Sequence, residues 1–103
     1  MLRPLALAAT LLLAAVPAAF AEIRYQGGDG STAETAIVIL GAEGSSDGIQ
    51  AEYDWLSRMR PEAEVISQAL IQDEGRYYDV LTVRSGGKEE QIHFDITEFF
   101  GTF

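Results

Sequence analysis

The chain has no cysteine, only three prolines, one tryptophan and one histidine. Without cysteine it cannot form a disulfide scaffold, a cysteine-ligated zinc site, a thiol nucleophile or a lipid-modified cysteine anchor. Its 103 residues allow at most one small domain. Basic side chains are also few, with seven Lys and Arg against 16 Asp and Glu and a formal net charge of −9. This charge disfavours nucleic acid and anionic lipid as partners, because both require a basic patch that displaces counterions.

The first 21 residues differ in composition from the rest of the chain. Arg3 is their only charged residue, and residues 5–16 form an almost uninterrupted apolar stretch. The stretch is shorter than the roughly 20 apolar residues that a bilayer span needs. Ala19-Phe20-Ala21 has the small-x-small pattern that signal peptidase cleaves. We therefore predict a cleaved signal peptide at 1–21 and an exported protein, in the periplasm or outside the cell; an uncleaved N-terminal anchor is the alternative.

Cleavage after Ala21 leaves Glu22–Phe103, which is 82 residues with a net charge of −10. A chain of this length builds one modest hydrophobic core. Residues 22–35 are polar and rich in glycine, which predicts an extended arm or loop. Residues 36–103 are expected to form a single small α+β domain. This mature chain would have no membrane contact.

One strand and one helix are expected in the first half of this domain. The apolar run at 36–40 is bounded by turn-forming residues and predicts a buried strand. A helix is expected from Asp47 to about Arg60, since Ser46 or Asp47 is a suitable N-cap and Pro61 cannot continue a helix. The helical periodicity predicts a buried stripe that contains Ile49, Tyr53, Leu56 and Met59, with Glu52 inside it and Trp55 at its edge.

Three strands are expected in the second half, at 63–72, 76–84 and 89–96. Glu74-Gly75 and Gly86-Gly87 are the turn signals between them. A two-residue Gly86-Gly87 loop would pair Ser85 with Lys88. That register sets three further cross-strand pairs, Leu81 with Ile92, Asp79 with Phe94 and Val80 with His93. The parity of the 63–72 strand stays open, because a three-residue turn would reverse it.

The predicted fold class is therefore α+β, with the order β-α-β-β-β. One helix packs on one face of an antiparallel sheet, and a short C-terminal turn at 97–103 returns its aromatic side chains to the core. This outline is similar to those of the small exported cystatin-like and PepSY-like modules. The similarity is one of topology, and topology by itself carries no function.

Four ordered sequence blocks resemble a family of small, often exported bacterial proteins. The blocks are GGDGSTAETAIVI at Gly27–Ile39, GIQAEYDWL at Gly48–Leu56, GRYYDVL at Gly75–Leu81 and FDITEFFG at Phe94–Gly101. They span most of the mature chain. The resemblance implies a family with no assigned activity, and it supplies no catalytic residues.

Asp29, Ser31 and Glu34 in the glycine-rich segment raise the question of a calcium loop. Calcium requires six to eight oxygen ligands, and this segment supplies two carboxylates, a hydroxyl and some carbonyls. Ser31-x-x-Glu34 also has capping-box spacing, and Asp29-Gly30 favours a turn. The local-structure interpretation is preferred, no metal site is predicted, and calcium binding stays open.

His93, the only histidine, lies two residues from Asp95 on the same face of the last strand. An aspartate-oriented histidine could act as a general base, with Ser67 or Thr82 as the nucleophile on a neighbouring strand. No sequence signal indicates a strained nucleophile turn or an oxyanion loop. No catalytic residue is therefore assigned, and a small hydrolase that uses His93 and Asp95 remains an alternative.

Glu52 and Asp79 both point toward the expected core, where a bare carboxylate is costly to bury. One explanation is a catalytic pair with separated pKa values. The preferred explanation is structural: each would accept backbone N–H groups from the Gly27–Thr32 loop or a helix end, or would pair with Arg76 or Arg84.

The sheet face opposite the helix is the predicted partner-binding surface. Its expected residues are Tyr78, Val80, Thr82, His93 and Asp95. A face that mixes apolar and polar side chains in this way is typical of contact sites. It would bind a partner protein or a second copy of the chain, or the N-terminal arm would cover it.

The sequence as a whole predicts a small exported interaction or binding module of the bacterial envelope, without a cofactor and without enzymatic activity. A cystatin-like inhibitor or a small-ligand binder is the first alternative, and the hydrolase is the second.

Overall fold

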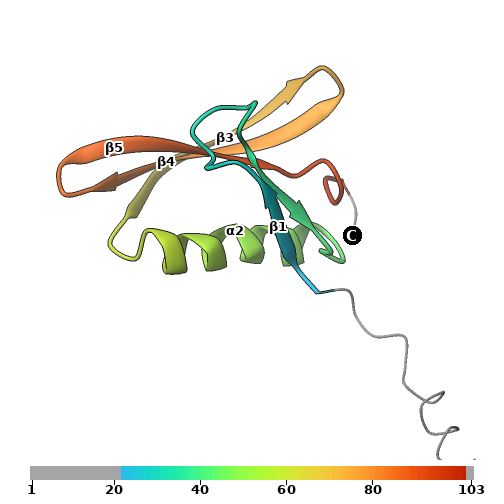
Figure 1. The fold of residues 1–103 in the computed structure, drawn as a ribbon, viewed down its shortest axis with the longest axis horizontal. Coiled ribbons are helices and arrows are strands. Elements are labelled where there is room, and N and C mark those ends of the chain that lie inside the picture. The colour runs from blue at the N-terminus through green and yellow to red at the C-terminus, as the bar shows by residue number, and fades with distance from the viewer. Residues whose placement is uncertain (1–21, 102–103) are drawn as a thin grey trace, which may run out of the picture.

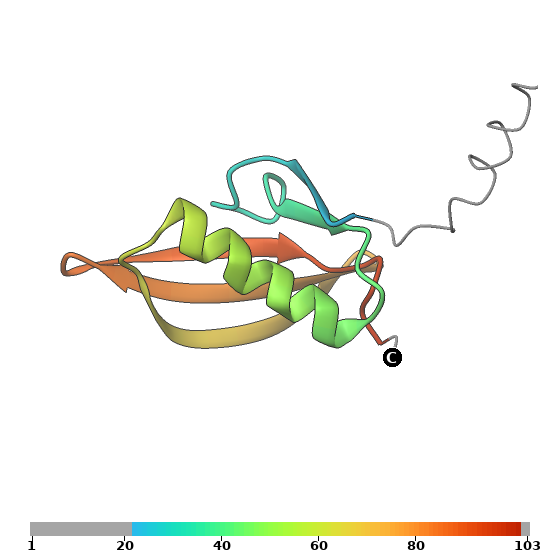
Figure 2. The ribbon, with the colours of Figure 1, turned by 90° about the horizontal axis from the view of Figure 1, so that it is seen from below.

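The structure, a computed structural model, describes residues 22–101, so the predicted signal peptide at 1–21 lies outside the described residues. Their elements are β1 (Arg24–Gly27), β2 (Ile37–Leu40), α2 (Ser45–Met59), β3 (Glu64–Asp73), β4 (Arg76–Ser85) and β5 (Lys88–Asp95). The five strands form one sheet in the order β1-β2-β5-β4-β3. Figures 1 and 2 show α2 lying across one face of this sheet. The α+β class is confirmed. The predicted order of elements and the predicted purely antiparallel sheet are both wrong.

The first correction is a strand within the predicted N-terminal arm. Residues Arg24–Gly27 pair antiparallel with β2, so the order of elements is β-β-α-β-β-β. Ile23 and Tyr25 pack against the core, and the Tyr25 hydroxyl donates a hydrogen bond to the Ala51 carbonyl of α2 at 2.8 Å. Two alternating apolar residues are too short a pattern to distinguish a strand from a loop, which is why the sequence predicted an arm.

The second correction concerns β5, which lies between β4 and β2. It is antiparallel to β4 but parallel to β2, where Ile37 pairs with Phe94 and Val38 with Asp95. The helix and two strands separate β2 from β5 along the chain. No local pattern encodes that pairing, so the sheet is mixed instead of antiparallel.

The two hairpins form as the turn residues predict. The β4–β5 register is the expected one, with Ser85 opposite Lys88, Leu81 opposite Ile92 and Val80 opposite His93. The β3–β4 hairpin turns at Glu74-Gly75, where both residues have positive φ. A two-residue turn resolves the parity of β3: Ala69 and Ile71 share the outer face with Val80 and Tyr78, whereas Gln68 and Leu70 lie on the helix side.

The helix is rotated relative to the predicted stripe. Its buried residues are Gly48, Ala51, Glu52, Trp55 and Leu56. The predicted stripe members Ile49, Tyr53 and Met59 are exposed, so that part of the prediction is wrong. Small residues on the buried side let α2 approach the sheet closely, and periodicity weighted by hydrophobicity overlooks them.

The start of α2 also differs from the expectation. Gly44 is the N-cap, and no side chain caps the helix. Neither Ser46 nor Asp47 takes that role, because the helix already begins at Ser45. The Asp47 carboxylate instead accepts a hydrogen bond from the Glu43 backbone N–H at 3.0 Å, one residue before the cap.

The core lies between α2 and the sheet. Trp55 meets Phe94 edge-on at a ring-centroid distance of 5.5 Å. The C-terminal turn at 97–101 closes one end, as predicted for its aromatic residues: Phe99 is 2% exposed against Gly48, and Phe100 stacks on Tyr77 at 4.3 Å. The turn therefore forms part of the wall around the N-terminal half of α2.

Candidate functional site

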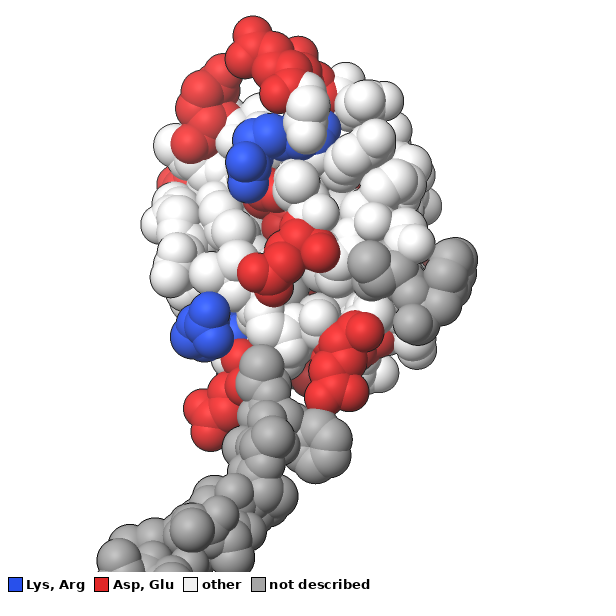
Figure 3. Space-filling view, turned by 90° about the vertical axis from the view of Figure 1, so that its right-hand side faces the viewer, with Lys and Arg blue, Asp and Glu red and all other residues white. Residues whose placement is uncertain are grey.

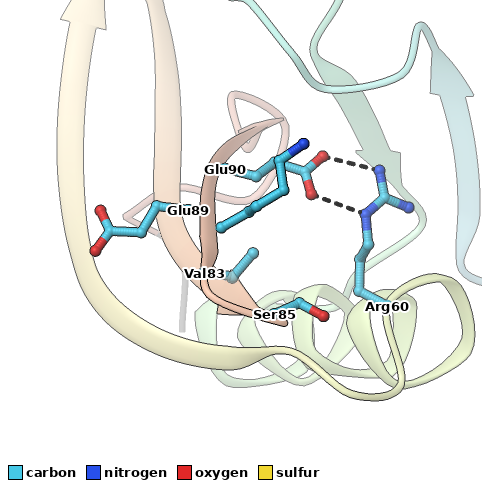
Figure 4. A pocket seen from close by; sticks show the side chains of 6 residues that line it. Arg60, Val83, Ser85, Glu89 and Glu90 are labelled. Carbon is cyan, nitrogen blue, oxygen red and sulfur yellow. Dashed lines mark hydrogen bonds and ion pairs between the residues drawn. The ribbon is translucent and has the colours of Figure 1, made fainter.

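Two cavities open on the helix side of the described residues. The larger, about 430 Å³, lies at the tip of the β4–β5 hairpin beside the end of α2 (Figure 4). Arg60 binds Glu90 there through two hydrogen bonds of 3.0 and 2.9 Å, and Arg84 pairs with Glu89 at 3.1 Å. Both glutamates of this cavity are already paired with arginines, which makes it the weaker candidate for a ligand site.

The second cavity, about 270 Å³, lies between the first half of α2, strands β3 and β4, and the C-terminal turn. We call it the Glu52–Asp79 cleft. Its walls are mainly apolar. The lining residues are Ser45, Ile49, Glu52, Gln68, Leu70, Asp79, Ile96, Phe99 and Phe100. Apolar walls with a few convergent polar groups are typical of small-molecule sites.

Three hydrogen-bonding side chains that line this cleft, Glu52, Gln68 and Asp79, are together called its floor. The Gln68 amide donates to both oxygens of Asp79, at 2.9 and 2.8 Å. Glu52 is 0% exposed, and neither of its carboxyl oxygens has a hydrogen-bond donor among the described residues. Its polar neighbour is the Asp79 carboxyl, which is 4% exposed. A neighbouring carboxyl disfavours the ionised form of Glu52.

The electrostatics of the pair follow from this geometry. Burial raises the pKa of Glu52 to about 10, and the adjacent Asp79 carboxyl adds to the rise through its hydrogen bond and its charge. Glu52 therefore keeps its proton at neutral pH.

The hydrogen-bond and ion-pair partners that were predicted for these two acids are wrong. Neither accepts backbone N–H groups from the Gly27–Thr32 loop, and neither pairs with Arg76 or Arg84. The loop rises on the opposite side of the sheet from α2 (Figure 1), which puts it out of reach. Arg76 binds Asp95 instead, at 2.7 Å. The alternative explanation, a catalytic pair with separated pKa values, stays a prediction.

The predicted partner-binding residues do share the outer face of the sheet. Tyr78 is 9% exposed, Val80 and Asp95 are 4% exposed, and Thr82 and His93 are partly buried. Ala33 of the glycine-rich segment and Ala36, which directly follows it, pack on Tyr78 and Val80. The chain therefore covers part of this face itself. Partner binding there stays a prediction, and it would require contact with the covering segment.

The glycine-rich segment is held by its own hydrogen bonds. Asp29 accepts the N–H and hydroxyl of Ser31, which lowers the pKa of Asp29. Reciprocal capping bonds join Thr32 and Thr35. This pair has the same three-residue separation as the predicted Ser31–Glu34 pair but is shifted by one residue along the chain. Within residues 22–101 no three His, Cys, Asp or Glu side chains gather as metal ligands. The geometry of these residues therefore adds no support for calcium binding.

His93 and Asp95 are engaged separately. The His93 ring nitrogen Nδ1 lies 2.9 Å from the Gly30 carbonyl, so it carries a proton and donates it. Asp95 accepts hydrogen bonds from Arg76 and from the N–H and hydroxyl of Thr97. Burial raises the pKa of Asp95, but these contacts outweigh it and leave the pKa below its usual range. The arrangement orients neither residue toward the other, so the hydrolase alternative has no geometric support.

In comparisons with known proteins, no family model, no curated protein and no solved structure matched the chain. The resemblance to small exported bacterial proteins is therefore an expectation from the four sequence blocks. No helix among residues 22–101 is long and apolar enough to cross a membrane. The chemistry of the cleft itself has to carry the functional argument.

Sequence reasoning identified Glu52 and Asp79 but missed the other residues of the cleft. Gln68 and Leu70 were overlooked because the parity of β3 was open. Phe99 was assigned only to the core. The available signal was Gly48, a small residue in the helix that leaves space for an aromatic ring from elsewhere in the chain.

Proposed function

We propose that this protein is an exported binding module that holds a small, partly apolar molecule in the Glu52–Asp79 cleft. The supporting observation is the fully buried Glu52 carboxyl, which lies without a donor at the floor of an apolar-walled cavity. Burying such a group costs several kcal/mol unless a partner compensates it. A protein that needed only stability would gain by having an apolar residue at this position. A ligand that donates a hydrogen bond would supply the partner that this buried carboxyl lacks.

The sequence favoured a protein-interaction module and gave a small-ligand binder as an alternative. This proposal prefers the small-ligand binder. The outer sheet face is partly covered by residues 33 and 36, whereas the cleft has exposed apolar side chains at its rim. Leu70 is 56% exposed and Ile49 is 43% exposed there. A binding role without catalysis is retained from the sequence prediction.

Binding in the cleft is tested by the paired variants Leu70→Ser and Ile71→Ser. Both residues are exposed neighbours on β3, but only Leu70 lines the cleft. With 2-phenylethanol as probe, we expect chemical-shift changes at Ile49, Ile96 and Phe99 in an NMR titration. Leu70→Ser should weaken binding by about fivefold to tenfold, from the loss of part of one leucine contact.

Ile71→Ser is the matched control and should leave this titration unchanged. If the shifts spread over the outer face, or if Ile71→Ser weakens binding as much as Leu70→Ser, the cleft is not the ligand site.

Export is the second part of the proposal. We expect the mature protein to begin at Glu22, because the Ala19-Phe20-Ala21 site directly follows the apolar stretch. N-terminal sequencing of protein from the envelope fraction and the medium tests this. Recovery of a soluble cytoplasmic protein that begins at Met1 would contradict it.

A further inference from the structure

The floor of the Glu52–Asp79 cleft has more hydrogen-bond acceptors than donors. Glu52 has two oxygens without a donor, and Asp79 receives only the Gln68 amide. A ligand group that donates hydrogen bonds fits this floor, whereas a carboxylate or phosphate would place acceptors against acceptors. A primary ammonium group has three donors and no acceptor.

Charge points to the same group. Both carboxyl side chains are almost completely buried. A cation bound between them would meet acceptor oxygens where water is excluded and where charge interactions are strong. The rest of the molecule adds to this effect: Figure 3 shows acidic side chains over the end of the protein that carries the start of α2 and the C-terminal turn, with few basic ones. Such a field attracts cations and repels anions.

The walls of the cleft define the rest of the ligand. Leu70, Ile96 and Phe99 surround the polar floor with apolar surface. The cavity volume of about 270 Å³ lies just below the range of roughly 300–1,000 Å³ usual for drug-sized ligands. It therefore fits a compact body, such as one aromatic ring or a short alkyl chain.

The geometry points to a small primary amine with an apolar body as the ligand, its ammonium group bound between Glu52 and Asp79 and its body against Leu70, Ile96 and Phe99. This inference rests on the proposed function and specifies its ligand class. It follows from the orphaned oxygens of Glu52, the acidic surroundings and the apolar walls.

Binding of such a ligand would displace a proton. At neutral pH a primary amine arrives as an ammonium ion, since its pKa is close to that of lysine, about 10.4. Before binding, Glu52 holds its proton. The bound ammonium lies beside Glu52 and favours its ionised form, so Glu52 releases the proton to solvent. No covalent bond forms or breaks, and the charge of Glu52 changes from 0 to −1 beside a cation of +1.

The test compares three probes of one shape: 2-phenylethylamine, 2-phenylethanol and phenylacetate. Affinity is measured by calorimetry on the purified protein at pH 7, in two buffers of different ionisation enthalpy. We expect the amine to bind at least about tenfold more tightly than the alcohol, and phenylacetate to bind more weakly than both. The difference between the buffers should show a net release of up to one proton per amine.

Two variants with the same Glu→Gln change locate the effect. Glu52→Gln should abolish the proton release and lower the amine affinity at least about tenfold. Glu62→Gln makes the same side-chain change at an exposed position outside the cleft and should change neither quantity. Circular dichroism checks that both variants are folded.

The outcomes separate the two proposals. Equal affinity for the amine and the alcohol, with shifts at the cleft, overturns the amine inference and leaves the binding module standing. An equal loss of amine affinity in both variants also overturns it, because a general charge effect would then explain the binding. Failure of all three probes to bind at millimolar concentration overturns both proposals.

Discussion

Replacing Glu52 with glutamine is expected to raise the free energy of unfolding at pH 8 by about 2–5 kcal/mol and to flatten its pH dependence. In the folded protein burial raises the pKa of Glu52 to about 10, whereas the unfolded value lies near 4.5. The folded state therefore binds one more proton than the unfolded chain between these values. Urea unfolding monitored by circular dichroism at pH 5, 7 and 9 measures the effect.

The sign follows from this difference in proton binding. For a group whose pKa is raised on folding, the stability contribution is complete below the unfolded pKa and is lost as pH rises toward the folded pKa. The wild-type protein should thus lose stability steadily from about pH 4.5 to pH 10. Asp95 acts in the opposite direction and in another window, because its lowered pKa removes stability only as pH falls below about 4.

Glu62→Gln serves as the control for charge alone, since Glu62 is exposed. Its unfolding curves should keep the slope of the wild type between pH 5 and 9. If Glu52→Gln keeps that slope as well, Glu52 is ionised in the folded protein, and the proton assigned to Glu52 is wrong.

Gly48→Ala is expected to destabilise the protein by about 3 kcal/mol or more. A Cβ at position 48 would overlap the ring of Phe99, which is 2% exposed and belongs to the core. At a free helical position the same substitution stabilises by up to about 1 kcal/mol, so a loss identifies the collision with the ring. Thermal and urea unfolding both measure the change.

A double variant tests the cause. Phe99→Leu by itself should cost stability by removing part of the core. In the Gly48→Ala background it should cost much less, or restore stability, because the smaller side chain leaves room for the new methyl group. Additive losses in the double variant would show that position 48 and Phe99 do not interact.

The hairpins show where a sequence is informative about structure. Gly86-Gly87 and Glu74-Gly75 are tight turns, and a tight turn determines which residues face each other on its two strands. The predicted register of β4 and β5 was therefore confirmed pair by pair. Pro61 likewise predicted the end of α2 to within two residues, because proline excludes a helical continuation by local sterics.

The rotation of α2 shows where the sequence misleads. Ile49 and Tyr53 look like core residues by their hydrophobicity, yet both are exposed, while Gly48 and Ala51 are buried. The Phe99 ring occupies the space beside Gly48, and that ring comes from the far end of the chain. Helical periodicity depends only on the local sequence and does not take such a partner into account, so it predicted the wrong buried stripe.

The sequence by itself determined the α+β class, the hairpin registers and the presence of two inward-facing acids, since these follow from local turn chemistry and side-chain periodicity. Only the tertiary structure decided that β5 lies parallel to β2, that the glycine-rich segment covers part of the outer face, and that Glu52 and Asp79 line one cleft. These features depend on contacts between residues far apart in the chain, whose free energy comes from burial and packing and leaves no local pattern.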